Sequence, residues 1–187
     1  IYRRDGNLVF ATVEAGRGQT GLYGSTDRGD TWEKLSSTNP RPMYFSQIRV
    51  DPNDPQRVYL GGRDLMRSDD GGKTFTDDGA PNVHPDHHAL WIDPSDSNHL
   101  LLGSDGGVST SFDRSETWRF YDNLPIAQFY KIGFDNRHPY WVCGGLQDNG
   151  TWCGPTNTLD NQGIRNADWH NVGGGDGFYV RIDPSDP

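Results

Sequence analysis

The sequence predicts an all-β protein made of repeated four-stranded antiparallel sheets, and three observations support this prediction. First, 24 glycines and 12 prolines among 187 residues are typical of a chain with many tight turns between short strands. Second, two motifs recur at nearly constant intervals. Third, residues between the motifs alternate apolar and polar, as half-buried strands do.

The first motif is an octapeptide that begins with serine and ends with an aromatic residue. Its third residue is aspartate, its fifth is glycine or serine, and its seventh is threonine. Successive copies begin 43 residues apart. The three copies, called octapeptides below, are 25–32, 68–75 and 111–118.

The second motif is an Asp-Pro turn that keeps the same interval. Asp93 follows Asp51 by 42 residues, and a looser copy begins at Asp135. A further copy spans 182–187. Together the two motifs leave room for about four short strands, A to D, in each repeat, which is the size of one β-propeller blade.

Counting repeats predicts about four blades and an incomplete propeller. Closed propellers have about four to eight blades, and open blade edges leave unpaired strands. We therefore expect the remaining blades to come from further sequence of a larger protein. The predicted segments of this partial propeller, which spans 1–187, are about 1–40, 41–82, 83–125, 126–175 and the start of a next blade at 176–187.

Charge and hydropathy exclude two classes of partner. The formal net charge of -9 repels the phosphate backbone of nucleic acids. Apolar runs such as 89–92 and 100–102 are far shorter than the roughly 20 residues of a membrane-spanning helix. We expect no nucleic-acid partner and no membrane span in this segment.

The octapeptide resembles the Asp box, also called the bacterial neuraminidase repeat. That repeat is found in sialidases, sortilin-type receptors, xyloglucanase-type glycoside hydrolases and photosystem assembly factors. The layout is similar to the sortilin-like and xyloglucanase-like branch. A sialidase fits less well, because its Arg-Ile-Pro start is absent: Arg49 is followed by Val50 and Asp51.

The chemistry of the octapeptide indicates a structural role. Its aspartate can accept hydrogen bonds from backbone N–H groups of the turn, its glycine permits a positive φ, and its aromatic residue anchors the hairpin between blades. Ser115 replaces that glycine in the third copy. The structural set is Ser25, Asp27, Gly29, Trp32, Ser68, Asp70, Gly72, Phe75, Ser111, Asp113 and Trp118.

The strand order of a meander places both motifs at one end of each sheet. We call this end the lower rim and the opposite end the upper rim. The upper rim then carries the B–C and D–A connections, which hold the least generic residues of the chain. The catalytic candidates there are Asp105, Asp148 and Asp176, and the binding candidates are His87, His88, Asp105, Gln147, Asp148 and Asn149.

Two simpler interpretations stay open at the upper rim. Asp-Gly and Asn-Gly are common hairpin turns, so Asp105, Asp148 and Asn149 can be turn residues only. No cofactor is required by the sequence. His84, Asp86, His87 and His88 are candidates for a metal site or for acid–base chemistry, but a solvated loop with histidines also explains them.

The two cysteines and the fourth repeat are irregular. Cys143 and Cys153 lack zinc-ligand spacing, so they form a disulfide or stay as two thiols. A two-residue turn at Asn149-Gly150 opposes Cys153 to Leu146, and a disulfide therefore requires a bulge or a wider loop. The fourth repeat lacks an octapeptide, and 155–163 is expected to form a long loop on the lower rim or to reach across to a neighbouring module.

Two functions follow from these observations. The first is a binding or scaffold module of a large secreted protein, extracellular or periplasmic, with a carbohydrate or protein ligand, as in sortilin-like propellers. The alternative is a glycoside hydrolase of the xyloglucanase type that uses upper-rim carboxylates. The resemblance to xyloglucanases implies one catalytic aspartate from each of two propellers, so half of such a site would lie outside this segment.

Overall fold

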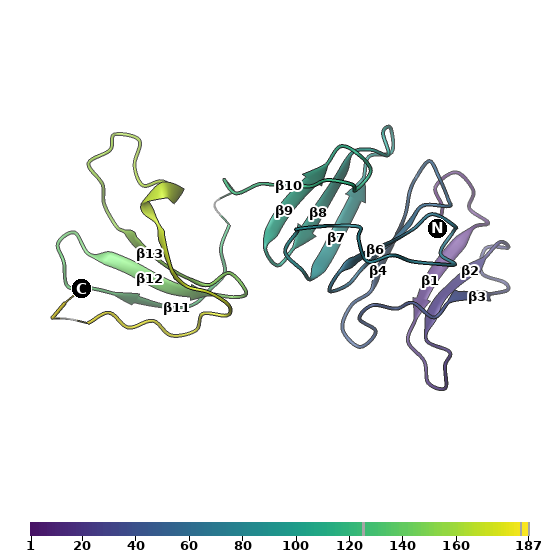
Figure 1. The fold of residues 1–187 in the computed structure, drawn as a ribbon, viewed down its shortest axis with the longest axis horizontal. Helices are drawn as coiled ribbons and strands as arrows, with labels where there is room; N and C mark the ends of the chain where they lie inside the picture. The colour runs from purple at the N-terminus through teal and green to yellow at the C-terminus, as the bar shows by residue number, and fades with distance from the viewer. Residues whose placement is uncertain (125, 184, 187) are drawn as a thin grey trace. The chain divides into compact units, whose positions relative to one another are not determined.

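The computed structural model describes residues 1–124, 126–183 and 185–186 (Figure 1). Within these ranges the secondary structure consists of strands and one 3-10 turn, η1 (Asn166–Asp168). The chain divides into two compact units, unit 1 (residues 1–121) and unit 2 (residues 122–187). No helix in the described ranges is long and apolar enough to cross a membrane. The predicted blade boundary at Pro125 and two prolines of the last Asp-Pro motif, Pro184 and Pro187, lie outside the described residues.

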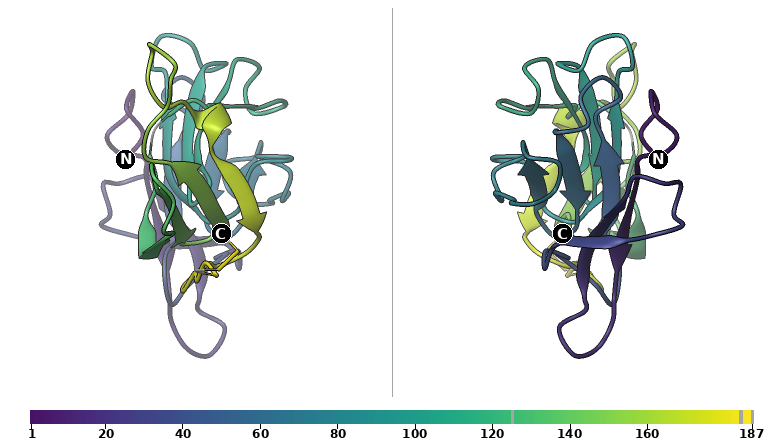
Figure 2. Two further views of the ribbon diagram at one scale, coloured as in Figure 1. Left: turned by 90° about the vertical axis from the view of Figure 1, so that its left-hand side faces the viewer. Right: turned by 90° about the vertical axis from the view of Figure 1, so that its right-hand side faces the viewer.

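Unit 1 contains three antiparallel sheets whose strands follow chain order (Figures 1 and 2). The first contains β1 (Val9–Val13), β2 (Gly21–Ser25) and β3 (Glu33–Ser36). The second contains β4 (Gln47–Val50), β5 (Val58–Gly61) and β6 (Leu65–Ser68). The third contains β7 (His87–Ile92), β8 (Leu100–Ser104), β9 (Gly107–Ser111) and β10 (Arg119–Phe120).

Unit 2 contains the fourth sheet. Its strands are β11 (Phe129–Phe134), β12 (Trp141–Leu146), β13 (Thr151–Pro155) and β14 (His170–Gly173), paired in that order. All neighbouring strands are antiparallel. The predicted all-β architecture of blade-like meanders, which make up an incomplete propeller, is confirmed.

The number of strands in a sheet varies from the predicted four. In the first sheet, β1 corresponds to strand B, since Val9 pairs with Ser25 as Val58 pairs with Ser68 in the second. In the second sheet, the fourth strand is reduced to one bridge between Arg67 and Thr76.

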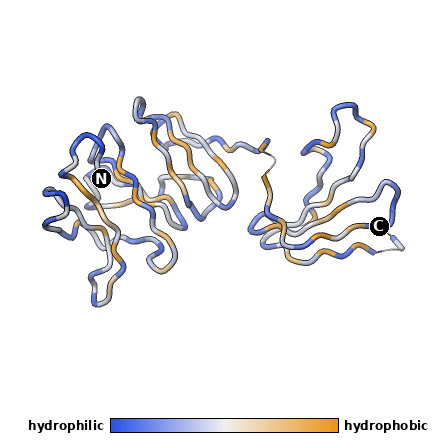
Figure 3. The backbone as a smooth tube through the Cα atoms, turned by 180° about the vertical axis from the view of Figure 1, so that it is seen from behind, coloured by the Kyte–Doolittle hydropathy of each residue, from blue (hydrophilic) through white to orange (hydrophobic). Residues whose placement is uncertain are grey.

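Two apolar clusters hold the sheets of unit 1 together. One contains Phe10, Leu22 and Val58, from the first and second sheets, with Phe75 of the second octapeptide packed against them. The other contains residues of the second and third sheets: Tyr59, Leu65, Leu90, Ile92, Leu100 and Leu102. Figure 3 shows this pattern, with hydrophobic residues along the strands and hydrophilic residues at most of the turns. Each fully buried side chain of this size contributes about 1.5–3 kcal/mol to folding.

Polar contacts join the second and third sheets at the lower rim. The Asp51 side chain, with an exposed fraction of 0%, accepts hydrogen bonds from Ser97 Oγ at 2.6 Å and from Arg114 Nη2 at 3.1 Å. Arg114 also pairs with Asp54 at 2.7 Å, and this contact holds the pKa of Asp54 below its usual value. A buried carboxylate requires such partners. The Asp-Pro turn of one sheet is therefore locked to the octapeptide of the next.

Candidate functional site

Each octapeptide forms a closed turn around its aspartate. In the first copy, Asp27 accepts hydrogen bonds from Ser25 Oγ at 2.6 Å and from the Thr31 backbone and hydroxyl at 2.9 and 2.5 Å. The Ser25 hydroxyl and then Thr31 lower the pKa of Asp27 to about 2. Gly29 has a φ of +96°, the left-handed conformation that glycine adopts without strain. The predicted turn chemistry is thus present in the structure.

The other two octapeptides repeat this geometry. Thr74 and Ser68 bind Asp70, whose pKa falls to about 2, chiefly because of the Thr74 hydroxyl. Asp113 binds Thr117 and Ser111 in the same way, and its pKa is lowered, with the Thr117 hydroxyl as the main cause. A carboxylate held ionised inside its own turn is not suited to donate a proton.

Backbone hydrogen bonds place the two motifs at one rim. Gly71 N–H donates to Gln56 O at 2.9 Å, and Arg114 N–H donates to Asn98 O at 3.1 Å, so each octapeptide contacts the A–B turn of its own sheet. In unit 2, Thr156 N–H donates to Tyr140 O at 3.2 Å. The long segment after β13 therefore begins at the lower rim, as predicted.

The upper rim of unit 1 brings together three of the predicted residues. Asp86 N–H donates to Arg63 O at 2.8 Å, and Asp105 N–H donates to Asp86 O at 3.3 Å. His88 Nε2 lies 3.0 Å from Asp105 Oδ1. These contacts hold the D–A loop against the B–C turns of two successive sheets. They make His88 and Asp105 an interacting pair at the start of β7 and the end of β8.

His87 differs from its neighbour because it is buried, with an exposed fraction of 3%. The register of β7 against β8 shifts between His87 and Ala89, so His88 is the extra residue of a β-bulge. Burial lowers the pKa of His87 to about 4, which keeps the imidazole neutral at physiological pH. His87 is therefore a buried structural residue beneath the upper rim, whereas the His88 side chain is accessible to a ligand.

Sequence reasoning missed an aromatic cluster beside this pair. The Phe45 ring lies 4.1 Å from the His88 ring, and the Tyr44 ring lies 6.2 Å from it. Arg41 lies over both aromatic rings and forms an ion pair with Asp86. Tyr44 has an exposed fraction of 69%. The sequence signal was an Arg-Pro-Met-Tyr-Phe run in a D–A loop, the same kind of loop that contributes His87 and His88.

The candidate metal residues do not form a cluster. Asp86 is paired with Arg41, and His84 Nδ1 lies 3.1 Å from Pro85 O. Among residues that the structure describes, no three His, Cys, Asp or Glu side chains form a group able to hold a metal ion.

The upper rim of unit 2 contains the other candidates. Asp148 N–H donates to Asp176 Oδ1 at 2.9 Å, and Gly150 N–H donates to Gly175 O at 2.8 Å. Asn149 Nδ2 donates to Gln147 O at 2.8 Å, and Asp148 has a φ of +57°. These residues form a B–C turn stabilised by the glycine-rich segment after β14, so their contacts are those of the turn interpretation.

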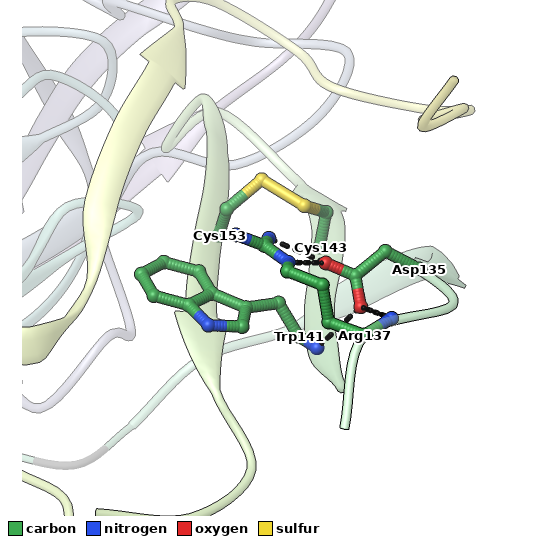
Figure 4. The surroundings of a disulfide bond; sticks show 5 residues. All are labelled: Asp135, Arg137, Trp141, Cys143 and Cys153. Carbon is green, nitrogen blue, oxygen red and sulfur yellow. Dashed lines mark hydrogen bonds and ion pairs between the residues drawn. A yellow bond between two sulfur atoms is a disulfide. The ribbon is translucent and has the colours of Figure 1, made fainter. Parts of the chain in front are cut away.

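A disulfide joins the two cysteines of unit 2 (Figure 4). Cys143 on β12 is directly opposite Cys153 on β13, with 4.0 Å between their Cα atoms. The last pair of this ladder is Gly145 with Thr151, so the loop is wider than the two-residue turn considered above. This wider loop provides the register that a disulfide requires.

An acidic turn lies next to the disulfide. Asp135 accepts hydrogen bonds from Trp141 N–H at 2.8 Å and from Arg137 N–H at 3.2 Å, and the Arg137 guanidinium lies over the Trp141 ring (Figure 4). Burial raises the pKa of Asp135, but these hydrogen bonds outweigh it and hold the pKa below its usual value. The looser Asp-Pro motif thus makes the same kind of turn as the others.

The fold is that of β-propeller blades. A GH74 enzyme from Niastella koreensis superposes with a TM-score of 0.53 at 17% identity, over 92% of this chain and 29% of that structure. No family model matches the sequence.

Sequence comparison shows similarity to xyloglucanases. An oligoxyloglucan reducing-end-specific xyloglucanase from Emericella nidulans is 27% identical over 165 residues, which is 78% of this chain and 19% of that protein. A probable enzyme of the same type from Neosartorya fischeri is 30% identical over 151 residues, which is 63% of this chain and 18% of that protein. The chain therefore spans about a fifth of the length of these curated relatives.

Proposed function

We propose that this chain is a segment of a xyloglucanase-type glycoside hydrolase, with the upper rim facing the glucan. The observation that carries this proposal is the similarity to two oligoxyloglucan-specific enzymes, which in one case extends over 165 residues. That similarity favours the hydrolase over the sortilin-like scaffold.

Hydrolysis of a glycosidic bond requires two carboxyl groups. One donates a proton to the leaving oxygen, and the other acts as a nucleophile or activates water, at a separation of about 5 to 9.5 Å. Asp105 is the candidate in unit 1, and Asp148 and Asp176 are the candidates in unit 2. A second propeller of the whole protein supplies the partner carboxylate if only one of them is catalytic.

The surroundings of Asp105 suit a sugar ligand. His88 Nε2, 3.0 Å from Asp105, keeps that carboxylate oriented, and the exposed Tyr44 ring provides a flat apolar surface. A pyranose ring stacks its C–H face on such a surface while its hydroxyls bind polar groups.

A binding module without hydrolysis is the second candidate. The observation that favours it is the contact between Asp176 and the Asp148 backbone, which assigns the Asp176 carboxylate a structural role in the turn. Such a module needs no pair of catalytic carboxylates. Its ligand is a carbohydrate or a protein.

We also propose that the protein is secreted, into an extracellular or periplasmic compartment. The Cys143–Cys153 disulfide supports this proposal, because disulfides form and persist in oxidising compartments. Fractionation of cells that produce the protein tests it. Recovery in the reducing cytosol with both thiols reduced would contradict it.

The decisive experiment compares Asp105→Asn and Asp148→Asn in the whole protein. Assays measure β-glucan hydrolysis and, separately, binding of the same glucan. A hydrolase predicts a loss of at least about 100-fold in hydrolysis for the catalytic position, with binding retained. A binding module predicts no wild-type hydrolysis and weaker binding in the variants.

Asp30→Asn is the matched control, because Asp30 is an exposed carboxylate of the lower rim. It should behave as wild type in both assays. If all three variants behave as wild type in both assays, Asp105 and Asp148 are turn residues only.

A further inference from the structure

A pocket of about 320 Å³ lies at the lower rim, between the first and second sheets of unit 1. Leu8, Phe10 and Leu35 of the first sheet form part of its apolar wall, and the first octapeptide contributes Trp32. The Asp-Pro turn and octapeptide of the second sheet supply Gln56 and Lys73. The pocket is thus at the rim opposite His88 and Asp105.

The equivalent space between the second and third sheets is filled by arginines. Arg57 pairs there with Asp69 at 2.6 Å, and Arg67 pairs with Glu116 at 2.6 Å and with Asp78 at 3.0 Å. Each of these positions has a counterpart one repeat earlier, fixed by the octapeptide register and by the Val9–Ser25 and Val58–Ser68 pairs.

The counterparts are smaller or oppositely charged. Leu8 stands where the next repeat has Arg57, and Gly24 stands where it has Arg67. Thr26 replaces Asp69, and Lys73 replaces Glu116. Because both arginines and both of these acids are lost together, the space between the first and second sheets stays open.

Three polar side chains around the pocket have no partners in the described part of the chain. Gln56, Lys73 and Glu33 are exposed, and their side chains take part in no hydrogen bond or ion pair there. By contrast, Asp70, which also lines the pocket, is bound within its own turn. Trp32 has an exposed fraction of 44%, compared with the half-buried Trp118 of the third octapeptide.

We infer that this pocket is a second, non-catalytic binding site for a glycosyl residue. The indole of Trp32 offers an apolar face, and Gln56, Glu33 and Lys73 offer donors and acceptors for hydroxyl groups. The pocket volume is at the small end of the range of about 300–1,000 Å³ that is usual for ligand sites. A site of this size takes one or two sugar units at most.

Charge excludes the other small-ligand classes. Two carboxylates, Glu33 and Asp70, line the pocket together with Lys73, and the chain has a net charge of -9, so an anion is repelled. A cation is repelled by the ammonium group of Lys73, which lines the pocket. A purely apolar ligand would remove three polar side chains from water without replacing their hydrogen bonds. A neutral ligand with one apolar face and several hydroxyls remains.

The experiment is a titration of the whole protein with cellotetraose, followed by the indole N–H signal of Trp32 in proton–nitrogen correlation spectra. Trp32→Phe assigns that signal. The inference rests on the proposed function only in the choice of a β-glucan as the probe. A saturable shift of the Trp32 signal is expected, and ligand at the upper rim does not move it.

The double variant Gly24→Arg and Lys73→Glu places an arginine and a glutamate in the pocket, at the positions that correspond to Arg67 and Glu116 one repeat later. At position 24 the three atoms nearest to a new Cβ all belong to the flexible side chain of Leu35, the nearest at 2.8 Å, so this side chain must shift. We expect this variant to lose the Trp32 shift, or to weaken cellotetraose binding at least tenfold, while hydrolysis measured at the upper rim is unchanged. Gly6→Arg adds an arginine at a position with nothing within 4 Å of a new Cβ, and it should bind as wild type.

If the first variant fails to fold, the variant Gln56→Ala with Lys73→Ala is tested instead. It should fold, because both side chains are exposed. The expected result is again a loss of the Trp32 shift. No shift in the wild type, or equal shifts in the wild type and a folded pocket variant, would overturn the inference. Either result leaves the hydrolysis assay, and therefore the proposed function, untouched.

Discussion

Unit 1 and unit 2 hold their antiparallel strands at the lower rim in different ways. In unit 1, an octapeptide closes the turn after β2, β6 and β9 with an aspartate that binds serine and threonine. In unit 2, a longer segment, 156–169, connects β13 to β14, and the Cys143–Cys153 disulfide joins β12 to β13. The same sheet architecture is therefore compatible with either a hydrogen-bonded turn or a covalent link between strands.

The largest expected effect tests the octapeptide aromatic residue. Trp118 Nε1 donates to Gly79 O at 3.0 Å, and the ring packs against the apolar cluster of the second and third sheets. We expect Trp118→Ala to lower the free energy of unfolding of unit 1 by about 3 kcal/mol. Chemical denaturation followed by circular dichroism measures it.

Trp32→Ala is the matched control, because Trp32 donates only to Gly29 O within its own turn and is exposed. It should cost less than half as much in the 187-residue chain. Equal losses for the two variants would mean that packing between sheets does not explain the role of the aromatic residue.

The next effect concerns the disulfide of unit 2. Closing a loop with a sequence separation of 10 residues restricts the unfolded chain and contributes about 3 kcal/mol. Replacing both cysteines by serine should destabilise unit 2 and leave unit 1 unchanged. Hydrogen exchange of β12 and of β8 reports on the two units separately. Uniform destabilisation of both units would show that the disulfide is not a local device.

Mild acid should affect unit 1 more than unit 2. The pKa of His87 is about 4 in the folded protein against an ordinary 6.5, so the unfolded chain takes up the proton first as pH falls. The contribution is fully present above about pH 6.5 and is lost as pH falls toward 4, with about 2 kcal/mol lost between pH 7.5 and 5. Described histidines of unit 2, His138 and His170, are exposed.

Melting at both pH values measures this effect, and His87→Leu is the control that removes the titrating group while keeping an apolar side chain. The variant should lose most of the pH dependence of unit 1. An unchanged dependence would place the titrating group elsewhere.

The smallest effect tests the one octapeptide without its glycine. Ser115 has a φ of +76° and a buried side chain, a conformation that costs a serine about 1 kcal/mol. Ser115→Gly relieves this strain but gives the unfolded chain more freedom. We expect a gain of less than about 1 kcal/mol in the free energy of unfolding. Gly72→Ser in the second octapeptide should have the opposite sign.

Much of the fold could be predicted because its determinants are local. Asp27, Asp70 and Asp113 bind residues two and four positions away, so their turns are readable in the sequence. The order of the strands follows from these turns.

The candidate site was less predictable because its contacts are not local. Phe45 meets His88 across 43 residues, which is one repeat interval, but the repeat does not indicate that the side chains of two equivalent loop positions touch. His87, whose N–H donates to Gly62 O of the preceding sheet, is buried by contacts distant in the sequence. The register of Cys143 and Cys153 depends on the length of the loop between β12 and β13. The Asn-Gly pair at 149–150 predicts a two-residue turn, but the loop is longer.

The contact between Asp51 and Arg114 has a consequence for how such a protein changes over time. It fixes the register of two successive sheets at the lower rim, through side chains that belong to the turns themselves. The register at the lower rim therefore does not depend on the upper-rim loops 37–46 and 81–86, which the Arg41–Asp86 ion pair joins to each other. They can accumulate substitutions and insertions, and so exchange one ligand for another, while the sheets beneath them stay in register.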